Sequence, residues 1–171
     1  MFKRRLISLV ALLLVFSLTA CGGGGPTHYY CELVIPLSDD FVESDSEQFD
    51  VIYTNGECAV GILRISFQAA IAEGITDTLS ARAFGLYYAN VMCERDVEMQ
   101  KHNKVDYCTY YDGEGALEHY YLEAFFRSDS AYFVVLFATL GEKASLYEND
   151  FLTFISGVYF LDKPIVEEVQ K

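Results

Sequence analysis

The chain has 171 residues, and its 25 acidic residues outnumber its 12 basic ones, which gives a formal net charge of −13. This charge argues against proteins that hold nucleic acid or lie flat on an anionic membrane, because phosphate groups would repel it. It favours a soluble protein or one with a cationic partner.

The amino terminus has the pattern of an export signal. Three basic residues at positions 3–5 precede an apolar run from Leu6 to Phe16 that only Ser8 interrupts. The run is shorter than the roughly 20 residues of a membrane-spanning helix, and small residues follow it. We therefore predict a cleaved signal peptide over residues 1–20.

The residues at the predicted cleavage site, Leu18, Thr19, Ala20 and Cys21, resemble the lipobox of bacterial lipoproteins. In that family the cysteine carries fatty acyl chains such as palmitate and becomes the first residue of the mature chain. The resemblance implies lipidation of Cys21 and a location outside the cytoplasm. This is the outer face of the cytoplasmic membrane, or the periplasm or outer membrane where the envelope has two membranes. The alternative is an ordinary secreted protein whose cleavage site adjoins a cysteine.

Four glycines, Gly22 to Gly25, indicate a flexible tether over residues 21–30. Glycine has the largest backbone freedom, and eight such residues reach about 15 Å. A phosphate-binding loop is the alternative, but it needs a strand before the glycines and a helix after them, and Pro26 follows here. Removing residues 1–20 leaves 9 basic and 25 acidic residues, a formal charge of −16. We expect one domain over residues 31–161 and a tail at 162–171.

The first half of the domain predicts a short strand and then a hairpin. The strand covers Cys31 to Pro36, where proline ends the ladder, and an acidic loop follows. Two β-rich runs, Phe49 to Thr54 and Glu57 to Ser66, flank Asn55-Gly56. This dipeptide is typical of a two-residue type I′ turn, in which both central residues have positive φ.

Helices are predicted from apolar stripes at helical spacing. Residues 80–94 place Phe84, Tyr87, Tyr88, Val91 and Met92 on one stripe, and residues 145–160 place Tyr147, Phe151, Phe154, Ile155 and Val158 on another. Ser145 and Glu148 have capping-box spacing at the start of the second helix. Four further strands are expected at 97–101, 105–111, 116–127 and 132–139. The last is apolar at every position except its final Thr139, so both of its faces should be covered.

These elements predict an α+β fold, an α/β/α sandwich in which a central antiparallel sheet of about six strands carries helices on both faces. Four segments of the chain resemble the PsbP-like fold over residues 31–161. They are LVIP (33–36), AVGILRISF (59–67), AYFVVLFAT (131–139) and FLTFISGVYF (151–160). These are packing motifs. Members of this family are mostly non-catalytic binding or assembly factors, and the resemblance implies the same role here.

Candidate metal and catalytic sites have weak support from spacing. Six carboxylates crowd one loop, but they lack the order and the turn glycine of a calcium loop; they are Asp39, Asp40, Glu43, Asp45, Glu47 and Asp50. The three histidines, His28, His102 and His119, show no zinc-ligand spacing. No glycine-flanked nucleophile motif accompanies any cysteine. We therefore expect neither a metal nor another cofactor, and no enzyme.

Four cysteines remain after Cys21, which is an even number in a chain exported to a compartment that permits oxidation. Chain proximity favours Cys31 with Cys58 and Cys93 with Cys108 as disulfides, although three connectivities are open. Buried reduced thiols are the alternative. Four tyrosines of the predicted strands, Tyr110, Tyr111, Tyr120 and Tyr121, fit either core packing or a stacking surface for a sugar or peptide, and core packing is the commoner case.

We therefore expect an exported, lipid-anchored, non-catalytic binding or assembly lipoprotein of the cell envelope. Its partner would be a protein or a small ligand, and no nucleic acid. The rival from another class is an extracytoplasmic enzyme or thiol-redox protein that uses Cys58, Cys93 or Cys108 with His119. A lipoprotein that binds a small solute is a third hypothesis, and it needs a deep cavity of several hundred cubic ångströms. An enzyme should bring a thiolate, a base and an orienting group together, whereas a binding module should show an apolar or aromatic groove.

Overall fold

A computed structural model describes residues 28–162, so the predicted signal peptide, residues 21–27 of the predicted tether with Cys21 and the four glycines, and most of the predicted tail lie outside the described residues. The strands are β1 (His28–Tyr30), β2 (Leu33–Ile35), β3 (Val42–Ser44), β4 (Val51–Thr54), β5 (Cys58–Ser66), β6 (Gln100–His102), β7 (Val105–Asp112), β8 (His119–Arg127), β9 (Ala131–Leu140) and β10 (Tyr159–Phe160). The helices are α1 (Phe67–Ala72), α2 (Ala81–Tyr87), the π-helical turn η3 (Tyr88–Met92), the 3₁₀ turns η4 (Gly115–Leu117) and η5 (Gly141–Lys143), and α3 (Ala144–Ser156).

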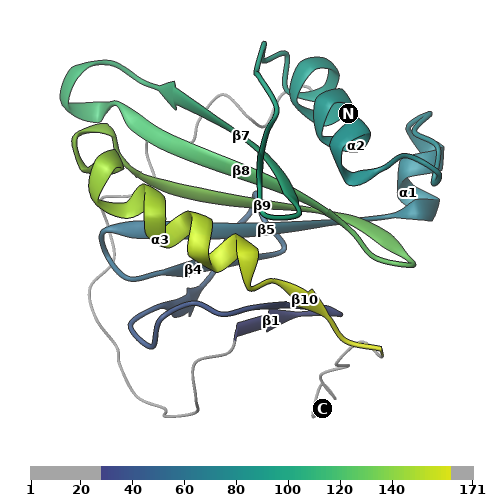
Figure 1. The fold of residues 1–171 in the computed structure, drawn as a ribbon, viewed down its shortest axis with the longest axis horizontal. Helices are drawn as coiled ribbons and strands as arrows, with labels where there is room; N and C mark the ends of the chain where they lie inside the picture. Colours follow the sequence, from purple (N-terminus) through teal and green to yellow (C-terminus); the bar gives the residue numbers. More distant parts are fainter. Residues whose placement is uncertain (1–27, 163–171) are drawn as a thin grey trace.

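Seven strands form one antiparallel sheet in the order β3-β4-β5-β9-β8-β7-β6 (Figure 1). Strand β9 lies at its centre and is buried at every position except Leu140, which confirms that both of its faces are covered. The neighbouring β8 is buried from His119 to Phe126. These two strands therefore need a complete layer of cover on each side, and the α+β sandwich is the result.

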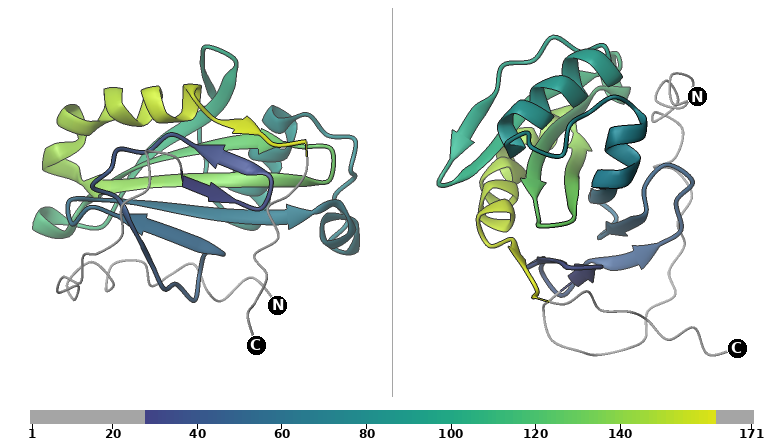
Figure 2. Two further views of the ribbon diagram at one scale, coloured as in Figure 1. Left: turned by 90° about the horizontal axis from the view of Figure 1, so that it is seen from below. Right: turned by 90° about the vertical axis from the view of Figure 1, so that its right-hand side faces the viewer.

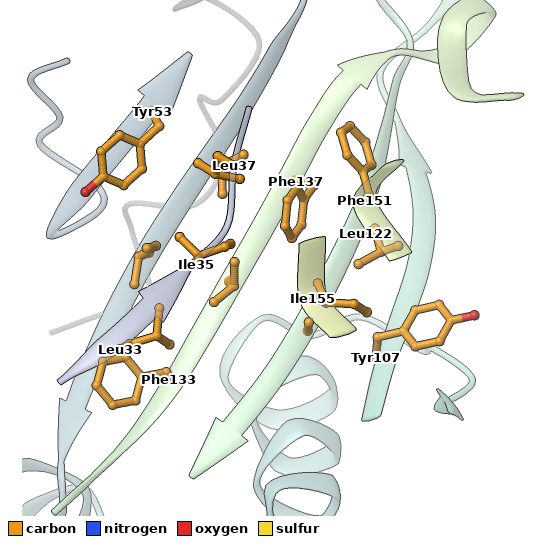
Figure 3. Close-up of a cluster of buried hydrophobic side chains, with 14 of the residues drawn as sticks. Leu33, Ile35, Leu37, Tyr53, Tyr107, Leu122, Phe133, Phe137, Phe151 and Ile155 are labelled. Atoms are coloured by element: carbon orange, nitrogen blue, oxygen red, sulfur yellow. The ribbon is translucent and has the colours of Figure 1, made fainter. Parts of the chain in front are cut away.

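Helix α3 and a small sheet cover one face of the large sheet. The small sheet has the order β1-β2-β10 and packs beside α3, as Figures 1 and 2 show. Leu33 and Ile35 of β2 meet Phe151 and Ile155 of α3 over Phe137 of β9 in one buried cluster (Figure 3). Each side chain of this kind stabilises the fold by about 1.5 to 3 kcal/mol on full burial.

Helices α1 and α2 cover the opposite face (Figure 2). Phe84 of α2 stacks on Tyr132 of β9, with ring centroids 4.2 Å apart. The backbone of α2 approaches the sheet closely at Gly85, where a Cβ atom would lie 2.5 Å from the Phe125 ring. The apolar stripe predicted for residues 80–94 ends early. The amide of Cys93 bonds to the carbonyl of Tyr88, five residues back, and the resulting π-helical turn η3 leaves Val91 exposed.

The structure contains three short strands that the sequence pattern missed. Strand β1 includes His28, which was expected in the tether; its ring bonds to the carbonyl of Phe41 and packs edge-on against Tyr53. Strands β3 and β10 pair with β4 and β2. Each has two or three residues, which is too short for a period-2 pattern to be read.

Two local predictions were wrong. The β4–β5 turn has positive φ at Gly56 and not at Asn55, so it is not a type I′ turn; the side-chain oxygen of Asn55 instead accepts from the amides of Glu57 and Cys58. The capping box at Ser145 does not form, because α3 already begins at Ala144 and Lys143 stands at its N-cap.

A buried carboxylate fastens the small sheet to the β8–β9 hairpin. Glu32 is 4% exposed and accepts hydrogen bonds from Ser130 (2.6 Å) and Ser128 (2.9 Å). Its other oxygen pairs with the guanidinium of Arg64 at 3.2 Å. Burial acts to raise the pKa of Glu32, but these hydrogen bonds outweigh it and hold the pKa below its usual value.

We expect Glu32→Gln to lower the free energy of unfolding at pH 7 by about 2 kcal/mol, because hydrogen bonds to a charged group are worth about 1.5 to 3 kcal/mol. A lowered folded-state pKa means that the stabilisation is complete above the ordinary Glu value and is lost as pH falls through the folded-state pKa. Urea unfolding measured across this range should show the difference between the two proteins shrinking toward acid pH. Glu43→Gln, an exposed carboxyl on β3, is the matched control and should change little. A pH-independent difference would contradict this role for Glu32.

Candidate functional site

A pocket of about 270 Å³ lies on the α2 face of the sheet, between the loop that precedes β4 and the end of η3. Its apolar and aromatic walls come from five segments and consist of Phe49, Leu63, Ile65, Tyr88, Met92, Tyr110 and Leu136. Its polar lining consists of Glu47, Gln48, Asp50, Cys93, Arg95 and Glu123. An apolar cavity with a few polar groups is the usual form of a small-molecule site.

The polar centre of the pocket is an ion pair. Arg95 Nη1 lies 3.1 Å from Glu123 Oε2, and the Glu123 side chain is 2% exposed. The guanidinium also lies over the Tyr110 ring, 4.3 Å from its centroid. Burial raises the pKa of Glu123, and Arg95 opposes that shift by favouring the ionised carboxylate. The pair can therefore remain buried because each charge has a partner.

The loop wall is held in place by packing on a glycine. Phe49 lies flat on β5 at Gly61, where an added Cβ would lie 2.7 Å from the Phe49 ring. The Ser46 hydroxyl accepts from the amides of Gln48 and Phe49, and Asp50 accepts from the amide of Arg64 at 2.7 Å. This part of the acidic loop is therefore a built wall of the pocket.

The opposite wall depends on η3. A π-helical turn widens the helix locally and is often found at functional sites. Here it places Tyr88 in the buried layer and Met92 and Cys93 at the pocket, and Glu94 follows with a positive φ of 55°. Arg95 then bonds through its amide to the carbonyl of Ala89. The turn thus brings Arg95 back over the sheet toward Glu123.

The four cysteines after Cys21 are free thiols in this structure. Cys93 and Cys108 both neighbour the ion pair: Cys93 lines the pocket, and the Cys108 thiol lies 3.9 Å from Glu123 Oε2. Burial raises the pKa of both thiols, that of Cys108 to about 12.

The expected pairing of Cys31 with Cys58 does not form. The Cys31 thiol neighbours Arg64, whereas Cys58 opens β5 six residues before Arg64, and those two backbone positions are about 20 Å apart along the strand. Burial raises the pKa of Cys31 as well, and that of Cys58 to about 11. Cys93 and Cys108, the other expected pair, are likewise free thiols, and both neighbour the ion pair of Arg95 and Glu123.

The structure does not bring His119 to any of these thiols. His119 is buried, its Nδ1 lies 2.8 Å from the carbonyl of Leu117, and its Nε2 has no hydrogen-bond partner among residues 28–162. It stands four residues before Glu123 on β8, about 13 Å away along the strand. Cys58 belongs to the buried cluster on the α3 face, whereas His119 lies next to Tyr121 on the other. Thiol, base and orienting group therefore do not converge.

The acidic loop disperses its carboxylates. Asp40 accepts a hydrogen bond from Asn55, Asp50 bonds to β5, and Glu47 lies at the pocket. Within residues 28–162, no three side chains of the His, Cys, Asp and Glu types are grouped so that they could hold a metal ion. In the same range, no helix is long and apolar enough to cross a membrane.

The tyrosines divide between the core and the pocket. Tyr120 and Tyr121 are buried, and Tyr110 stacks on Tyr121 with centroids 5.0 Å apart. Tyr111 alone of these four is exposed. They form no continuous stacking surface on the outside of the sheet, because neighbours along a strand face opposite sides.

Sequence reasoning missed Arg95 and Glu123 as site residues. One signal was present: Glu123 is the single carboxylate in the apolar run HYYLEAFF of residues 119–126. A charged residue inside a strand that is buried on both faces requires a partner. Nothing in the pattern identifies Arg95 as that partner, because 28 residues separate the two.

A search against protein-family models found no match, and a search of curated proteins found none either. A search of solved structures found similarity to the solution structure of cyanobacterial PsbP (CyanoP) from Synechocystis sp. PCC 6803. The TM-score is 0.54 with 11% sequence identity, over 84% of this chain and 99% of that one. The fold is therefore PsbP-like, as the resemblance of the four packing motifs implied. At this identity the similarity shows the fold alone.

The raised thiol pKa values predict slow alkylation by iodoacetamide at pH 8. Cys58 and Cys108 should react about 100-fold or more slowly than free cysteine, since only the thiolate reacts, and the half-buried Cys31 and Cys93 should react before them. Mass spectrometry of the mature chain, begun at residue 21 with Cys21→Ser, resolves the four sites. The same chain in urea, where all four should react alike, is the control. One thiol that reacts faster than free cysteine would indicate a nucleophile and contradict this prediction.

Proposed function

We propose that this protein is an exported, lipid-anchored, non-catalytic binding or assembly lipoprotein of the cell envelope, and that it binds its ligand in the pocket between the acidic loop and η3. The observation that carries the proposal is the chemistry of that pocket. Its walls are apolar and aromatic, and its central charges neutralise each other. It offers a surface for binding and no activated nucleophile.

The thiols and the histidine support a non-catalytic role. Burial raises the pKa of the two thiols beside the pocket, Cys93 and Cys108, so both are protonated at neutral pH. A nucleophilic cysteine needs a lowered pKa or an adjacent base, and His119 lies far from both. The PsbP-like fold agrees with a binding or assembly role.

The size of the pocket favours a small ligand over an extended one. At about 270 Å³ it lies just below the range of about 300 to 1,000 Å³ that holds drug-sized ligands. A small solute, or one chemical group of a larger partner, fits this space. The hypothesis of a lipoprotein that binds a small solute is therefore the second candidate function.

The anchor is proposed from the lipobox-like residues alone. Cys21→Ala should abolish incorporation of labelled palmitate and release the protein from the membrane fraction, because two or more acyl chains, at about 0.8 kcal/mol per buried methylene, are needed for stable anchoring. Cys31→Ala is the matched control and should keep both label and membrane association. Palmitate labelling of the Cys21→Ala protein, or unchanged detergent partitioning after signal cleavage, would contradict the proposal.

A further inference from the structure

We propose that the pocket accepts a small organic cation, a compound with an apolar body of about one aromatic ring and a single ammonium group. This inference rests on the proposed function, because it names the class of ligand for the same pocket. Three features of the lining support it: the apolar walls, the excess of carboxylates, and the internal neutralisation of the one guanidinium.

The apolar body follows from the walls. Leu63, Ile65 and Leu136 present aliphatic side chains from β5 and β9, and Phe49 and Met92 face the pocket from the loop and from η3. The flexible thioether of methionine adapts to the shape of a ligand, and an aromatic ring provides a flat apolar surface for it. Transfer of a ligand's apolar surface from water to these walls would supply most of the binding free energy.

The charge of the head group follows from the polar lining. Three carboxylates, Glu47, Asp50 and Glu123, line the pocket, and Arg95 is the one basic residue among its lining residues. The lining is negative whichever protonation state Glu123 takes, because Glu47 and Asp50 together outweigh Arg95. A cation is therefore attracted to the mouth and an anion repelled.

An anionic ligand would meet a second cost at Arg95. Its guanidinium is already paired with Glu123 at 3.1 Å and covered on one face by Tyr110. An anion that took Arg95 would leave the buried carboxylate of Glu123 without its partner, and an unpaired buried charge destabilises a protein strongly. A cation leaves the ion pair intact and can also lie against an aromatic side chain, and Phe49 and Tyr88 are both among the lining residues.

Three probes of nearly equal shape separate the contribution of the apolar body to the affinity from the contribution of the charge. They are the cation 2-phenylethylammonium, the neutral 2-phenylethanol and the anion 3-phenylpropionate. Each would be titrated into the ¹⁵N-labelled mature chain, begun at residue 21 with Cys21→Ser, and followed by amide shifts of the pocket residues. We expect the cation to bind at least tenfold more tightly than the anion, with the alcohol between them. Added salt should weaken the cation and leave the alcohol unchanged, because screening acts on charge alone.

Two variants test the site itself. Glu47→Gln removes an exposed charge at the mouth and should weaken the cation about two- to fivefold, the range of an exposed ion pair, without affecting the alcohol. Glu142→Gln, which makes the same charge change outside the pocket, is the matched control and should change neither. Met92→Trp should fill the pocket and abolish binding of all three probes, while circular dichroism shows the fold retained.

The outcomes separate this inference from the proposed function. Tightest binding by the anion, or equal binding by all three probes, would overturn the assignment of a cation and leave the pocket as a binding site. Shifts that persist in Met92→Trp, or no binding by any probe, would overturn the pocket as the site. A covalent product of any probe, detected by mass spectrometry after incubation, would instead contradict the non-catalytic function, whatever the order of affinities.

Discussion

The structure depends on one constraint: strands β8 and β9 carry mainly apolar side chains on both faces, so both faces must be covered. Their side chains alternate between two buried layers, with Phe133 and Phe137 on the α3 side and Tyr132 and Val134 on the α2 side. The cover on the α3 side is continuous, because α3 and the small sheet meet in one cluster. The serine pair at the β8–β9 turn fastens that cover through Glu32.

The cover on the α2 side comes in two pieces, and the pocket lies between them. One piece consists of α1 and of α2 with its π-helical end, and the other is the loop that places Phe49 on Gly61. Glu123 lies on this face of β8, at the place where the two pieces do not meet. Arg95 returns from η3 to neutralise it. The ion pair thus permits a charged residue in a fully covered strand and gives the pocket its polar centre.

Local patterns predicted the elements whose signal lies within one segment. The continuous apolar run of β9, the stripe of α3 and the turn at Asn55-Gly56 each gave the right element, and the layers followed from the need to cover β9. Strands β1 and β10 exist only because they pair with β2, and the π-helical turn shifted the end of the α2 stripe. The site required the meeting of Arg95 with Glu123 across 28 residues, which no periodicity encodes. The lone carboxylate of β8 indicated only one of these two residues, Glu123.

The most direct test of binding at this pocket is photocrosslinking in intact cells. A photoreactive benzophenone side chain would replace Gln48, at the mouth of the pocket, or Asn149, which is exposed on α3 across the sheet. We expect a covalent small-molecule adduct at position 48, lost when Met92→Trp fills the pocket, and none at position 149. Adducts at position 149 alone, or an adduct at position 48 that survives Met92→Trp, would show that the protein binds elsewhere.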